Sequence, residues 1–490
     1  MDYGNSGGLW GEGVRMSAEG QQQYDRYEMV VLGAGYAGLM TALRLRPQRM
    51  RVLVINPTGQ FVERVRLQES IVAPVAVRIP SIRTLLAGTG IDFMRATVVS
   101  MDADSRIVRV DTDFGQREIA FEQAVYATGS NTNVDDIPGV AENAYRLETK
   151  DGPRSPAALR ACLAAASGKA VKVIAVGGAE TSVEVAGEIK NCWPDAAVTM
   201  ISRSRCGEFK GEGVEAAVRR QLENLGVTMI DRETITEVRP NEVLTEHGRC
   251  VPYDICIWSG GLRASPLARQ AGIATDSADR ILVDPNLRSI SHPHILAVGD
   301  AAHPIAPTGA PYRLSAFAAL ASGAYAADLI AAQRNSREVL PFSFSTLGQG
   351  VAIGRGGVGF FSYPNDKQSL FIVTGPLARH IRNFFVWLVS YVLKLERRQP
   401  GFFWWPGRGR VSWEQAKIAM RDVPPPVKDR AARFKEPKHP RGAIVWGIRH
   451  DTVRRLIQPI VLQTKSRRAR HQNRLRRYRY EPSRPDCVPQ

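Results

Sequence analysis

The fold of this chain is decided by one stretch, Glu28-Met29-Val30-Val31-Leu32-Gly33-Ala34-Gly35-Tyr36-Ala37-Gly38-Leu39-Met40-Thr41-Ala42-Leu43. An apolar run, a G-x-G-x-x-G turn and a helical run follow one another, which is the order that a dinucleotide-binding turn requires. Gly33 permits the sharp turn, Gly35 lets the backbone approach a pyrophosphate, and Gly38 lets the helix pack closely on the strand. The free N–H groups at the start of the helix then face the phosphates. The stretch therefore predicts a Rossmann-like α/β unit.

A second turn of the same kind lies downstream. The strand-like run Val173-Ile174-Ala175-Val176 leads into Gly177-Gly178-Ala179-Glu180-Thr181-Ser182. Two such units in one chain indicate two bound dinucleotides, and so an enzyme that moves electrons between them. Farther on, an apolar strand ends in Ala297-Val298-Gly299-Asp300, which links a flavin to the first unit. Asp300 either contacts this flavin or caps the helix that follows.

Length and composition indicate a globular chain of two or three domains. It has 490 residues, of which 44% are hydrophobic and 23% are charged, as in ordinary globular proteins. The formal net charge of +17 is concentrated at one end, because residues 401–490 hold 22 Lys and Arg against 7 Asp and Glu. Residues 1–400 are close to neutral. The basic character therefore belongs to a tail.

The six cysteines are scattered and form no C-x-x-C pair. This distribution argues against a disulfide framework and against a dithiol redox centre, and no metal site is predicted. The N-terminus is polar and rich in Gly and Gln, and it lacks the apolar core of a signal peptide. We therefore expect a disordered leader and a cytoplasmic protein.

Candidate strands divide the rest of the chain. The run Arg51–Asn56 reads as the second strand of the first unit and places Asn56 where an acid commonly binds the ribose, which an amide can also do. A three-stranded excursion is expected at 97–100, 107–110 and 118–121, before the chain returns at 124–129. The predicted parts are a disordered leader (1–27), an FAD-binding domain in two pieces (28–150 and 276–332), an NAD(P)-binding domain between them (151–275), a C-terminal region (333–405) and a basic tail (406–490).

These motifs resemble those of the two-dinucleotide flavoproteins, the pyridine nucleotide-disulfide oxidoreductase fold, and most of all those of type II NADH dehydrogenases. The matching pieces are Val31–Leu39, Tyr126–Gly129, Val183–Glu188, Trp258–Arg263 and Ala297–Ala302. The resemblance implies FAD in the first site, with Asp300 accepting a hydrogen bond from the ribityl chain. It implies NADH or NADPH in the second site, and an acceptor such as a quinone that reoxidises the flavin.

The candidate site residues come from these motifs and their neighbours. The cofactor-binding candidates are Gly33, Ala34, Gly35, Ala37, Gly38, Asn56, Arg64, Val98, Thr128, Gly129, Gly177, Gly178, Ala179, Ser202, Arg203, Gly260, Gly261, Gly299 and Asp300. Glu184 is the catalytic candidate, because the resemblance implies that it faces the nicotinamide or the isoalloxazine; it could instead be a solvated helix residue. Glu63 and Arg64 reach the isoalloxazine side of the pocket or form an exposed ion pair. His303 carries a proton or has a capping or surface role.

Three departures from the family pattern bear on the function. Ala179 and Ser182 stand where the family has Gly, and a methyl group at Ala179 intrudes on the approach to the pyrophosphate. Ser202, with Arg203 and Arg205 beside it, replaces the acid of an NAD-selective site, which makes NADPH a credible coenzyme. The helix after Asp300 lacks the Gln residues that line the quinone site in the family.

The C-terminal region predicts contact with a membrane surface. The apolar run Phe384–Leu393 is too short to span a bilayer, but it is flanked by basic residues that include Arg379 and Arg382 and is followed by Phe402-Phe403-Trp404-Trp405. Rings beside cations suit a lipid interface with anionic headgroups. The alternative is a helix packed on its own body or on a homodimer partner. Beyond it, Ser466–Arg470 and Arg474–Tyr480 form a basic stretch that is a solvated tail, attracts lipid or, least expected, binds nucleic acid.

Three functions remain open from these residues. The leading one is an FAD-dependent NAD(P)H:acceptor oxidoreductase, attached peripherally to the inner face of the membrane. A second is a pathway-specific flavin oxidase or dehydrogenase with a degenerate nicotinamide site. A third is a redox-sensing flavoprotein whose basic tail binds nucleic acid.

Overall fold

The computed structural model describes residues 25–73, 81–147, 152–208, 211–308, 312–346, 348–362 and 369–420. The expected leader up to residue 24, and the basic tail from residue 421 with its runs Ser466–Arg470 and Arg474–Tyr480, lie outside these residues. All described residues belong to one unit, Met1–Asp429.

The first glycine turn belongs to a sheet whose central strands are parallel. The strand order is β3-β2-β1-β6-β5-β4. β18 also pairs with β6, on the edge of β6 opposite to β1. The strands are β1 (Asp25–Leu32), β2 (Val52–Asn56), β3 (Asp92–Arg95), β4 (Thr97–Asp102), β5 (Ile107–Thr112), β6 (Gly115–Tyr126) and β18 (Ile295–Ala297). β1 and β2 are apolar along most of their length and buried, as expected for strands covered on both faces.

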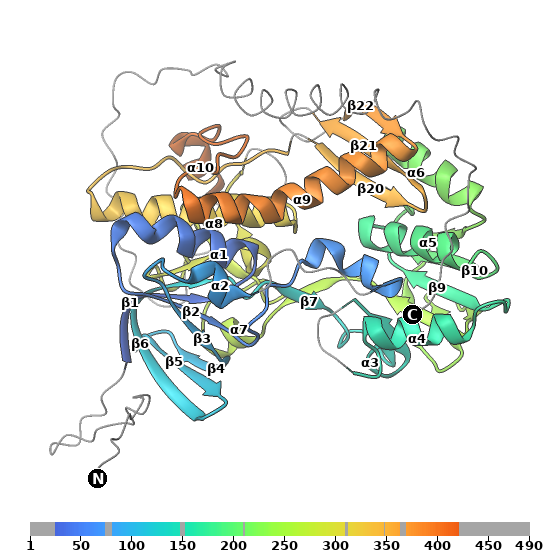
Figure 1. The fold of residues 1–490 in the computed structure, drawn as a ribbon, viewed down its shortest axis with the longest axis horizontal. Helices are drawn as coiled ribbons and strands as arrows, with labels where there is room; N and C mark the ends of the chain where they lie inside the picture. Colours follow the sequence, from blue (N-terminus) through green and yellow to red (C-terminus); the bar gives the residue numbers. More distant parts are fainter. Residues whose placement is uncertain are drawn as a thin grey trace, which may run out of the picture. The chain divides into compact units, whose positions relative to one another are not determined.

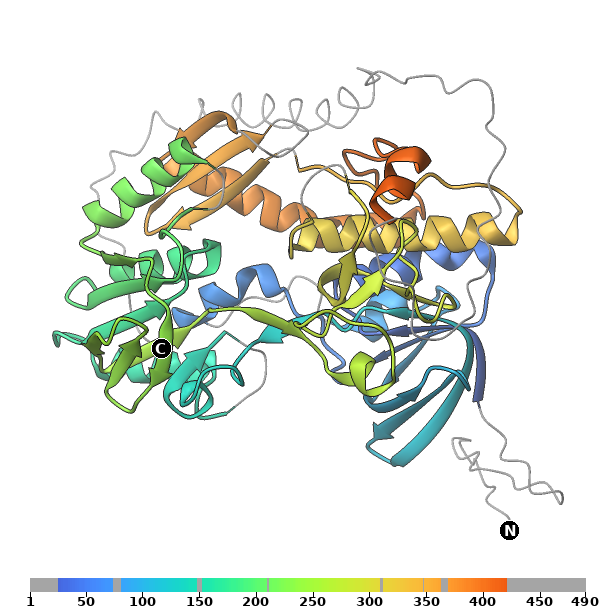
Figure 2. The same ribbon diagram turned by 180° about the vertical axis from the view of Figure 1, so that it is seen from behind.

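Two helices cover one face of this sheet. They are α1 (Tyr36–Leu45), which follows the first glycine turn, and α8 (Ala316–Arg334). Figures 1 and 2 show them packed side by side along the sheet. Among the described residues, α8 alone is long and apolar enough to cross a membrane, and 72% of its apolar window is buried inside the protein.

The expected strands of the first unit are present, with two differences in extent. β1 starts at Asp25, inside the predicted leader, because its first residues pair in parallel with β6 (Asp25↔Ile119). The last strand of the excursion and the returning strand were expected as separate elements. They are one strand, β6, whose first half pairs with β5 and whose second half pairs with β1 and β18.

The second glycine turn belongs to another parallel sheet. Its order is β11-β10-β9-β15-β8, with strands β8 (Ala144–Arg146), β9 (Lys172–Val176), β10 (Ala197–Ser202), β11 (Thr228–Asp231) and β15 (Ile255–Trp258). We call this sheet and its helices the nicotinamide unit, and the first sheet with its helices the flavin unit. β8 precedes the predicted boundary at residue 151, so the nicotinamide unit contains residues from both sides of that boundary. The helices of this unit are α3 (Val140–Asn143), α4 (Pro156–Ala165), α5 (Glu180–Cys192) and α6 (Glu212–Asn224).

Smaller elements connect and extend the two units. A two-stranded sheet of β7 (Ser130–Thr132) and β16 (Leu262–Ala264) lies where the chain passes between them. The others are β12 (Ile235–Val238), β13 (Glu242–Thr245), β14 (Cys250–Pro252), β17 (Ile281–Val283), β19 (Ala302–Pro304), α2 (Ile82–Leu86), α7 (Leu267–Gln270), and the 3₁₀ helices η1 (Arg46–Gln48), η2 (Arg64–Ile71) and η3 (Gly299–Ala301).

The C-terminal region is an antiparallel sheet followed by a long helix. β20 (Gly348–Ile353), β21 (Gly356–Ser362) and β22 (Ser369–Thr374) pack on α5, α6 and α9 (Pro376–Arg398). The chain then forms α10 (Trp413–Met420). Trp405, Val411 and Ala416 are buried. The first residues of the predicted basic tail are therefore packed against the body of the protein.

Candidate functional site

The first glycine turn has the close packing that its spacing predicts. Gly33 has φ +103°, and a Cβ added there would lie 2.4 Å from Ala127 O. A Cβ added at Gly38 would lie 1.9 Å from Gly33 O. At Gly35, by contrast, an added Cβ would meet no heavy atom within 4 Å. Gly33 and Gly38 are required by the fold itself, whereas Gly35 borders open space at the N-terminus of α1, as a pyrophosphate site needs.

Asn56 braces this turn from the end of β2. Its Oδ1 accepts a hydrogen bond from the backbone N–H of Ala34 at 3.0 Å, and its Nδ2 donates to the carbonyl oxygen of Thr58 at 2.9 Å. The backbone N–H of Ala96 donates to Asn56 O at 3.1 Å. Val98, a half-buried residue on β4, follows two residues after Ala96 and so lies near the end of β2 that carries Asn56. Asn56 is therefore part of the turn, and its Oδ1 retains a lone pair for a ribose hydroxyl.

Asp300 follows β18 and is partly buried beside the same strand ends. Its Oδ2 accepts a hydrogen bond from Ser130 Oγ at 2.9 Å, which leaves Oδ1 to accept from a ligand hydroxyl. Burial raises the pKa of the Asp300 carboxyl, and the Ser130 hydrogen bond and the charges of Arg64 and Arg280 oppose that rise. The residue before it, Gly299, has φ +62°. A partly buried carboxylate with one oxygen left over fits a ribityl hydroxyl.

The remaining candidates of the first site lie around these residues. A Cβ at Gly33 would come 3.2 Å from Thr128 Cα, and a Cβ at Gly299 would come 3.2 Å from Ala37 Cβ. Gly129 has φ +70°. Because the strands that carry these residues are parallel, their carboxyl ends meet at one edge of the sheet. The structure thus brings together the residues predicted for the flavin from four separate stretches of sequence.

The second glycine turn has the same form with more side chain in it. Gly177 has φ +122°, and a Cβ added there would lie 2.4 Å from Ser182 Oγ. That hydroxyl donates to Val176 O at 3.2 Å. Ala179 is extended (φ −88°) at the start of α5, so its methyl group stands at the position that Gly35 leaves bare. The turn still ends at a helix N-terminus, which suits a pyrophosphate, but the Ala179 methyl group adds bulk where the backbone of the first turn is bare.

The end of β10 lies directly against this turn. A Cβ added at Gly178 would lie 2.3 Å from Ser202 Oγ, and Ser202 is 5% exposed. Its hydroxyl accepts from the backbone N–H of Ser204 at 3.2 Å. Arg205 Nε forms an ion pair with Glu215 Oε1 at 2.6 Å, whereas Arg203 is exposed. Of the two arginines expected near a 2′-phosphate, Arg205 is therefore committed to a carboxylate and Arg203 points to solvent.

Gly260 and Gly261 follow β15, the neighbour of β9. Gly261 has φ +76°, and Trp258 Nε1 donates to Gly260 O at 2.8 Å. The backbone N–H of Ser259 donates to Val176 O at 3.0 Å. These bonds hold the two glycines beside the second turn, at the carboxyl edge of the nicotinamide sheet.

Glu184 is buried in a cluster of charged and polar side chains. Arg382 Nε and Nη2 donate to its two carboxylate oxygens at 3.0 and 2.8 Å, the backbone N–H of Ala352 donates at 2.9 Å, and Gln68 Nε2 donates as well. Burial raises the pKa of the Glu184 carboxyl, and the Arg382 charge opposes that rise. Glu184 is thus not a solvated helix residue, and its contact with the nicotinamide or isoalloxazine stays a prediction.

Several expected roles of the neighbouring charges change in this cluster. Arg382 was expected to flank a membrane-surface helix but is 4% exposed, because α9 turns this side chain inward to Glu184. Arg379 pairs with Glu188 on α5 at 2.8 Å. Glu63 is buried and pairs with Arg66 at 3.2 Å, so the alternative of an exposed ion pair does not hold for Glu63, and contact of Glu63 and Arg64 with the isoalloxazine stays a prediction.

His303 belongs to a small ionic group behind Asp300. Its Nδ1 lies 2.7 Å from Asp276 Oδ2 and 2.8 Å from Arg280 Nη2. Burial alone would raise the pKa of Asp276, but the His303 and Arg280 hydrogen bonds lower it below its usual value. Sequence reasoning missed Asp276 and Arg280, because nothing in the sequence pairs these positions with His303.

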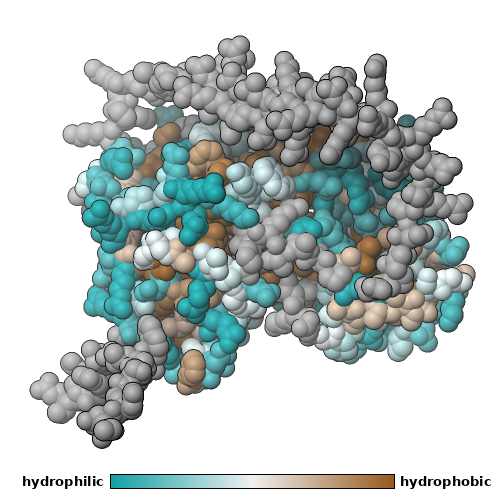
Figure 3. Space-filling model, viewed as in Figure 1, coloured by the Kyte–Doolittle hydropathy of each residue, from teal (hydrophilic) through white to brown (hydrophobic). Residues whose placement is uncertain are grey.

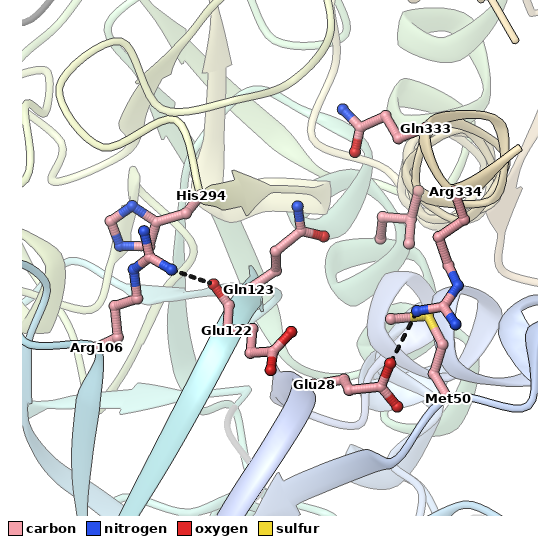
Figure 4. A pocket seen from close by; sticks show the side chains of 9 residues that line it. Glu28, Met50, Arg106, Glu122, Gln123, His294, Gln333 and Arg334 are labelled. Atoms are coloured by element: carbon pink, nitrogen blue, oxygen red, sulfur yellow. Dashed lines mark hydrogen bonds and ion pairs between the residues drawn. The ribbon is translucent and has the colours of Figure 1, made fainter. Parts of the chain in front are cut away.

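A cavity of about 430 Å³ lies away from both glycine turns (Figure 4). Its lining includes Glu28 at the start of the apolar part of β1, Gln123 on β6, His294 before β18 and Arg334 at the end of α8. Arg334 and Glu28 form an ion pair at 2.8 Å across one side. The cavity is therefore at the amino-terminal edge of the flavin sheet, opposite to the edge where the predicted flavin residues gather.

The chain belongs to the pyridine nucleotide-disulphide oxidoreductase family, whose pattern matches residues 27–323. The fold and the two turns define this class, and the chain is an FAD-dependent NAD(P)H oxidoreductase. Among curated proteins it is 24% identical over 350 residues to the demethylphylloquinone reductase NdbB of Synechocystis, with 68% of this chain and 86% of that protein covered. It is 28% identical over 298 residues to an NADH dehydrogenase-like protein of Mycobacterium tuberculosis, with 56% and 72% covered.

Solved structures share the fold at low sequence identity. The sulfide:quinone oxidoreductase of Aquifex aeolicus superimposes with a TM-score of 0.64 at 18% identity, over 77% of this chain and 93% of that chain. The NDH2 of Plasmodium falciparum, solved with NADH, superimposes with a TM-score of 0.62 at 15% identity, over 78% and 99%. Each of these likenesses covers more of this chain than the family match over residues 27–323 does.

Proposed function

We propose that this protein transfers electrons from NADH or NADPH through FAD to a quinone at a membrane surface. The observation that carries the proposal is the pair of glycine turns, each with a helix N-terminus at the carboxyl edge of a parallel sheet, in one chain. Bound FAD would supply a ring that accepts a hydride and later releases two electrons. The residues around it would bind and orient both dinucleotides.

In the first site, Gly35 would leave room for the flavin pyrophosphate, and Asp300 Oδ1 would accept from the ribityl chain. Arg64, an exposed residue whose charge lowers the pKa of the Asp300 carboxyl, would lie beside the isoalloxazine. In the second site, Gly178, Ala179 and the first turn of α5 would hold the coenzyme pyrophosphate.

A quinone is the acceptor that the relatives favour. The relatives include NdbB, a demethylphylloquinone reductase, and the internal alternative NAD(P)H-ubiquinone oxidoreductase A1 of Arabidopsis, which is 25% identical over 462 residues. The helix expected to carry Gln residues at this site, α8, begins instead with Ala316, Phe317 and Ala318. We infer that an apolar wall replaces amide contacts to the acceptor.

The outer face of α9 supports attachment to a membrane surface. Leu377, Phe384 and Trp387 are 63%, 49% and 40% exposed, on a helix whose other face packs on the protein. After the helix, Trp404 is 61% exposed. Figure 3 shows hydrophobic residues at the surface between hydrophilic ones on the face it draws. Exposed rings next to basic residues suit the headgroup layer of a bilayer.

Anaerobic reduction tests the reaction. Purified protein with its flavin would be mixed with NADH or NADPH without oxygen, and the flavin absorbance would be followed. We expect bleaching by at least one coenzyme and recovery of the absorbance when a quinone is added. A flavin that neither coenzyme bleaches would contradict the proposal and favour a degenerate nicotinamide site. If the coenzyme reduces the flavin but no quinone reoxidises it, a quinone is not the acceptor and that part of the proposal fails.

Co-sedimentation with vesicles tests the surface. Phe384→Ser and Trp387→Ser would be compared with Phe114→Ser, which changes a ring that is 99% exposed between β5 and β6. We expect the α9 variants to bind vesicles of anionic and neutral lipid less well, and Phe114→Ser to bind as the parent does. Equal binding by all three variants would rule out α9 as the lipid contact.

A further inference from the structure

Arg382 is a buried cation whose hydrogen bonds join separate parts of the chain. Besides both oxygens of Glu184, its guanidinium reaches Glu69 Oε1 at 2.7 Å through Nη1 and Val65 O at 3.1 Å through Nη2. The planar fork of arginine allows this set of bonds, whereas the single ammonium of a lysine does not. Arg382 is 4% exposed, so these protein groups and not solvent satisfy its guanidinium.

The partners of Arg382 belong to the two different cofactor units. Glu184 lies on α5, the helix that starts at the second glycine turn. Val65 and Glu69 lie on η2, which follows β2 of the flavin unit. The first residue of η2, Arg64, is close enough to Asp300 for its charge to act there. η2 therefore lies between the predicted flavin site and the nicotinamide helix, and Arg382 binds it at both Val65 and Glu69.

The helix that carries Arg382 is itself fastened to the flavin unit. At the other end of α9, Glu396 is fully buried and accepts from Arg44 Nη1 on α1 at 3.2 Å. Glu396 also accepts from the backbone N–H of Phe403 at 2.8 Å. α9 thus spans the two units, with a buried ion pair to each.

We propose that Arg382 is a positioning residue for hydride transfer, because it sets the separation between α5 and the flavin unit without touching either dinucleotide. This inference rests on the proposed function. Hydride transfer needs the reacting atoms about 3–3.5 Å apart, and a misplacement of about 1 Å can cost roughly 100-fold in rate. Protein donors also occupy both carboxylate oxygens of Glu184.

The test compares Arg382→Gln and Arg382→Lys with the parent protein. Three quantities would be measured: the rate constant of anaerobic flavin reduction at saturating coenzyme, the dissociation constant of the oxidised coenzyme, and amide hydrogen exchange in residues 64–71 and 180–192. We expect the rate constant to fall about 10-fold or more in Arg382→Gln, with a dissociation constant changed by less than about 3-fold. We also expect faster exchange in both segments.

Arg379→Gln is the matched control. It removes the ion pair to Glu188 between the same two helices, but no hydrogen bond ties Arg379 to the described residues of η2. We expect a rate constant within about 2-fold of the parent, as for a partly exposed pair, and unchanged exchange in residues 64–71.

Three results would overturn the inference. A parental rate constant in Arg382→Gln would do so, as would equal slowing in Arg379→Gln, because looseness between α5 and α9 would then suffice. If Arg382→Gln does not fold, Arg382→Lys provides the test, because lysine keeps the positive charge but lacks the planar guanidinium. A parental rate constant of flavin reduction in Arg382→Lys would then contradict the inference. If neither coenzyme reduces the parent flavin, the proposed function fails, while the exchange data still show whether Arg382 holds η2 to α5.

Discussion

The two glycine turns share one backbone form and differ in what fills it. The first has Gly33, Gly35 and Gly38 at the three key positions, and the second has Gly177, Ala179 and Ser182. At Gly38 any side chain would collide with the turn, since a Cβ would lie 1.9 Å from Gly33 O. At Ser182 a side chain is present, and its hydroxyl bonds Val176 O. The second turn therefore has room for a side chain at the position where the first turn has none.

This difference fits the two roles proposed for the dinucleotides. A flavin that stays bound gains from a close backbone approach to its pyrophosphate, which bare glycines allow. A coenzyme that must leave in each cycle gains nothing from tight uniform binding once it is saturating. A methyl group and a hydroxyl in the second turn are compatible with that looser requirement.

Replacing Gly35 with Val should have the largest effect, because it makes the first turn bulkier than the second. The backbone there is extended, with φ −77°, and an added Cβ meets no protein atom. We therefore expect a folded protein that has lost its flavin, measured as the ratio of flavin to protein after purification and by circular dichroism. Stoichiometric FAD in this variant would mean that the first turn does not hold a pyrophosphate.

Replacing Asp300 with Ala should come next. The variant removes the partly buried carboxylate that Ser130 orients, and with it the charge-assisted hydrogen bond that we propose to the ribityl chain. Such bonds contribute about 1.5–3 kcal/mol, so we expect the dissociation constant of FAD to rise roughly 10- to 100-fold. Fluorescence titration of the apoprotein measures it, with Ser130→Ala as a milder companion. Unchanged affinity in Asp300→Ala would leave this residue a helix cap.

Replacing Ser202 with Glu should change the choice of coenzyme at the second turn. The parent has no acid here, and Arg203 is exposed nearby, so we expect NADPH to work at least as well as NADH. A carboxylate would repel the 2′-phosphate and shift preference toward NADH by about 10-fold. The ratio of kcat/KM for the two coenzymes reports the shift. A parent that reacts briskly with NADH and ignores NADPH would contradict the expectation.

Replacing Ala179 with Gly should have the smallest effect and makes the second turn more like the first. Removing one methyl group from the approach to the pyrophosphate should tighten coenzyme binding by about 3-fold, the effect expected for a group of that size. Titration with the oxidised coenzyme measures this. Weaker binding in Ala179→Gly would show that the methyl group packs on the coenzyme and does not obstruct it.

The sequence predicts the fold because its strongest signals are local. Apolar runs such as Val52–Asn56 and Ile255–Trp258 become buried parallel strands, and each glycine turn precedes a helix. The meeting of Gly33, Thr128 and Asp300 at one sheet edge also follows, since carboxyl ends of parallel strands share an edge. The boundary at residue 151 is harder to predict from the sequence, because β8 is only three residues long and belongs to the second sheet through its pairing with β15.

The sequence does not reveal the contacts that join distant segments. Arg382 lies among rings and basic residues, a pattern typical of a membrane interface, and only the packing of α9 on α5 and η2 turns it inward. Glu63 stands next to Arg64 in sequence but pairs with Arg66, since one turn of a 3₁₀ helix brings residues three apart together. Pairing partners of this kind depend on side-chain direction, which composition and spacing do not encode.

The insertion of β18 beside β6 also has a consequence for how the chain is made. The flavin sheet begins with β1 at Asp25 but is not complete until Ile295–Ala297 has joined it. At synthesis rates of about 5–20 residues per second, the edge of β6, which ends at Tyr126, waits roughly 9–34 s for Ala297 to be made. During that time the whole nicotinamide unit emerges and can fold first. The second nucleotide site can therefore be completed before the first, although it comes later in the sequence.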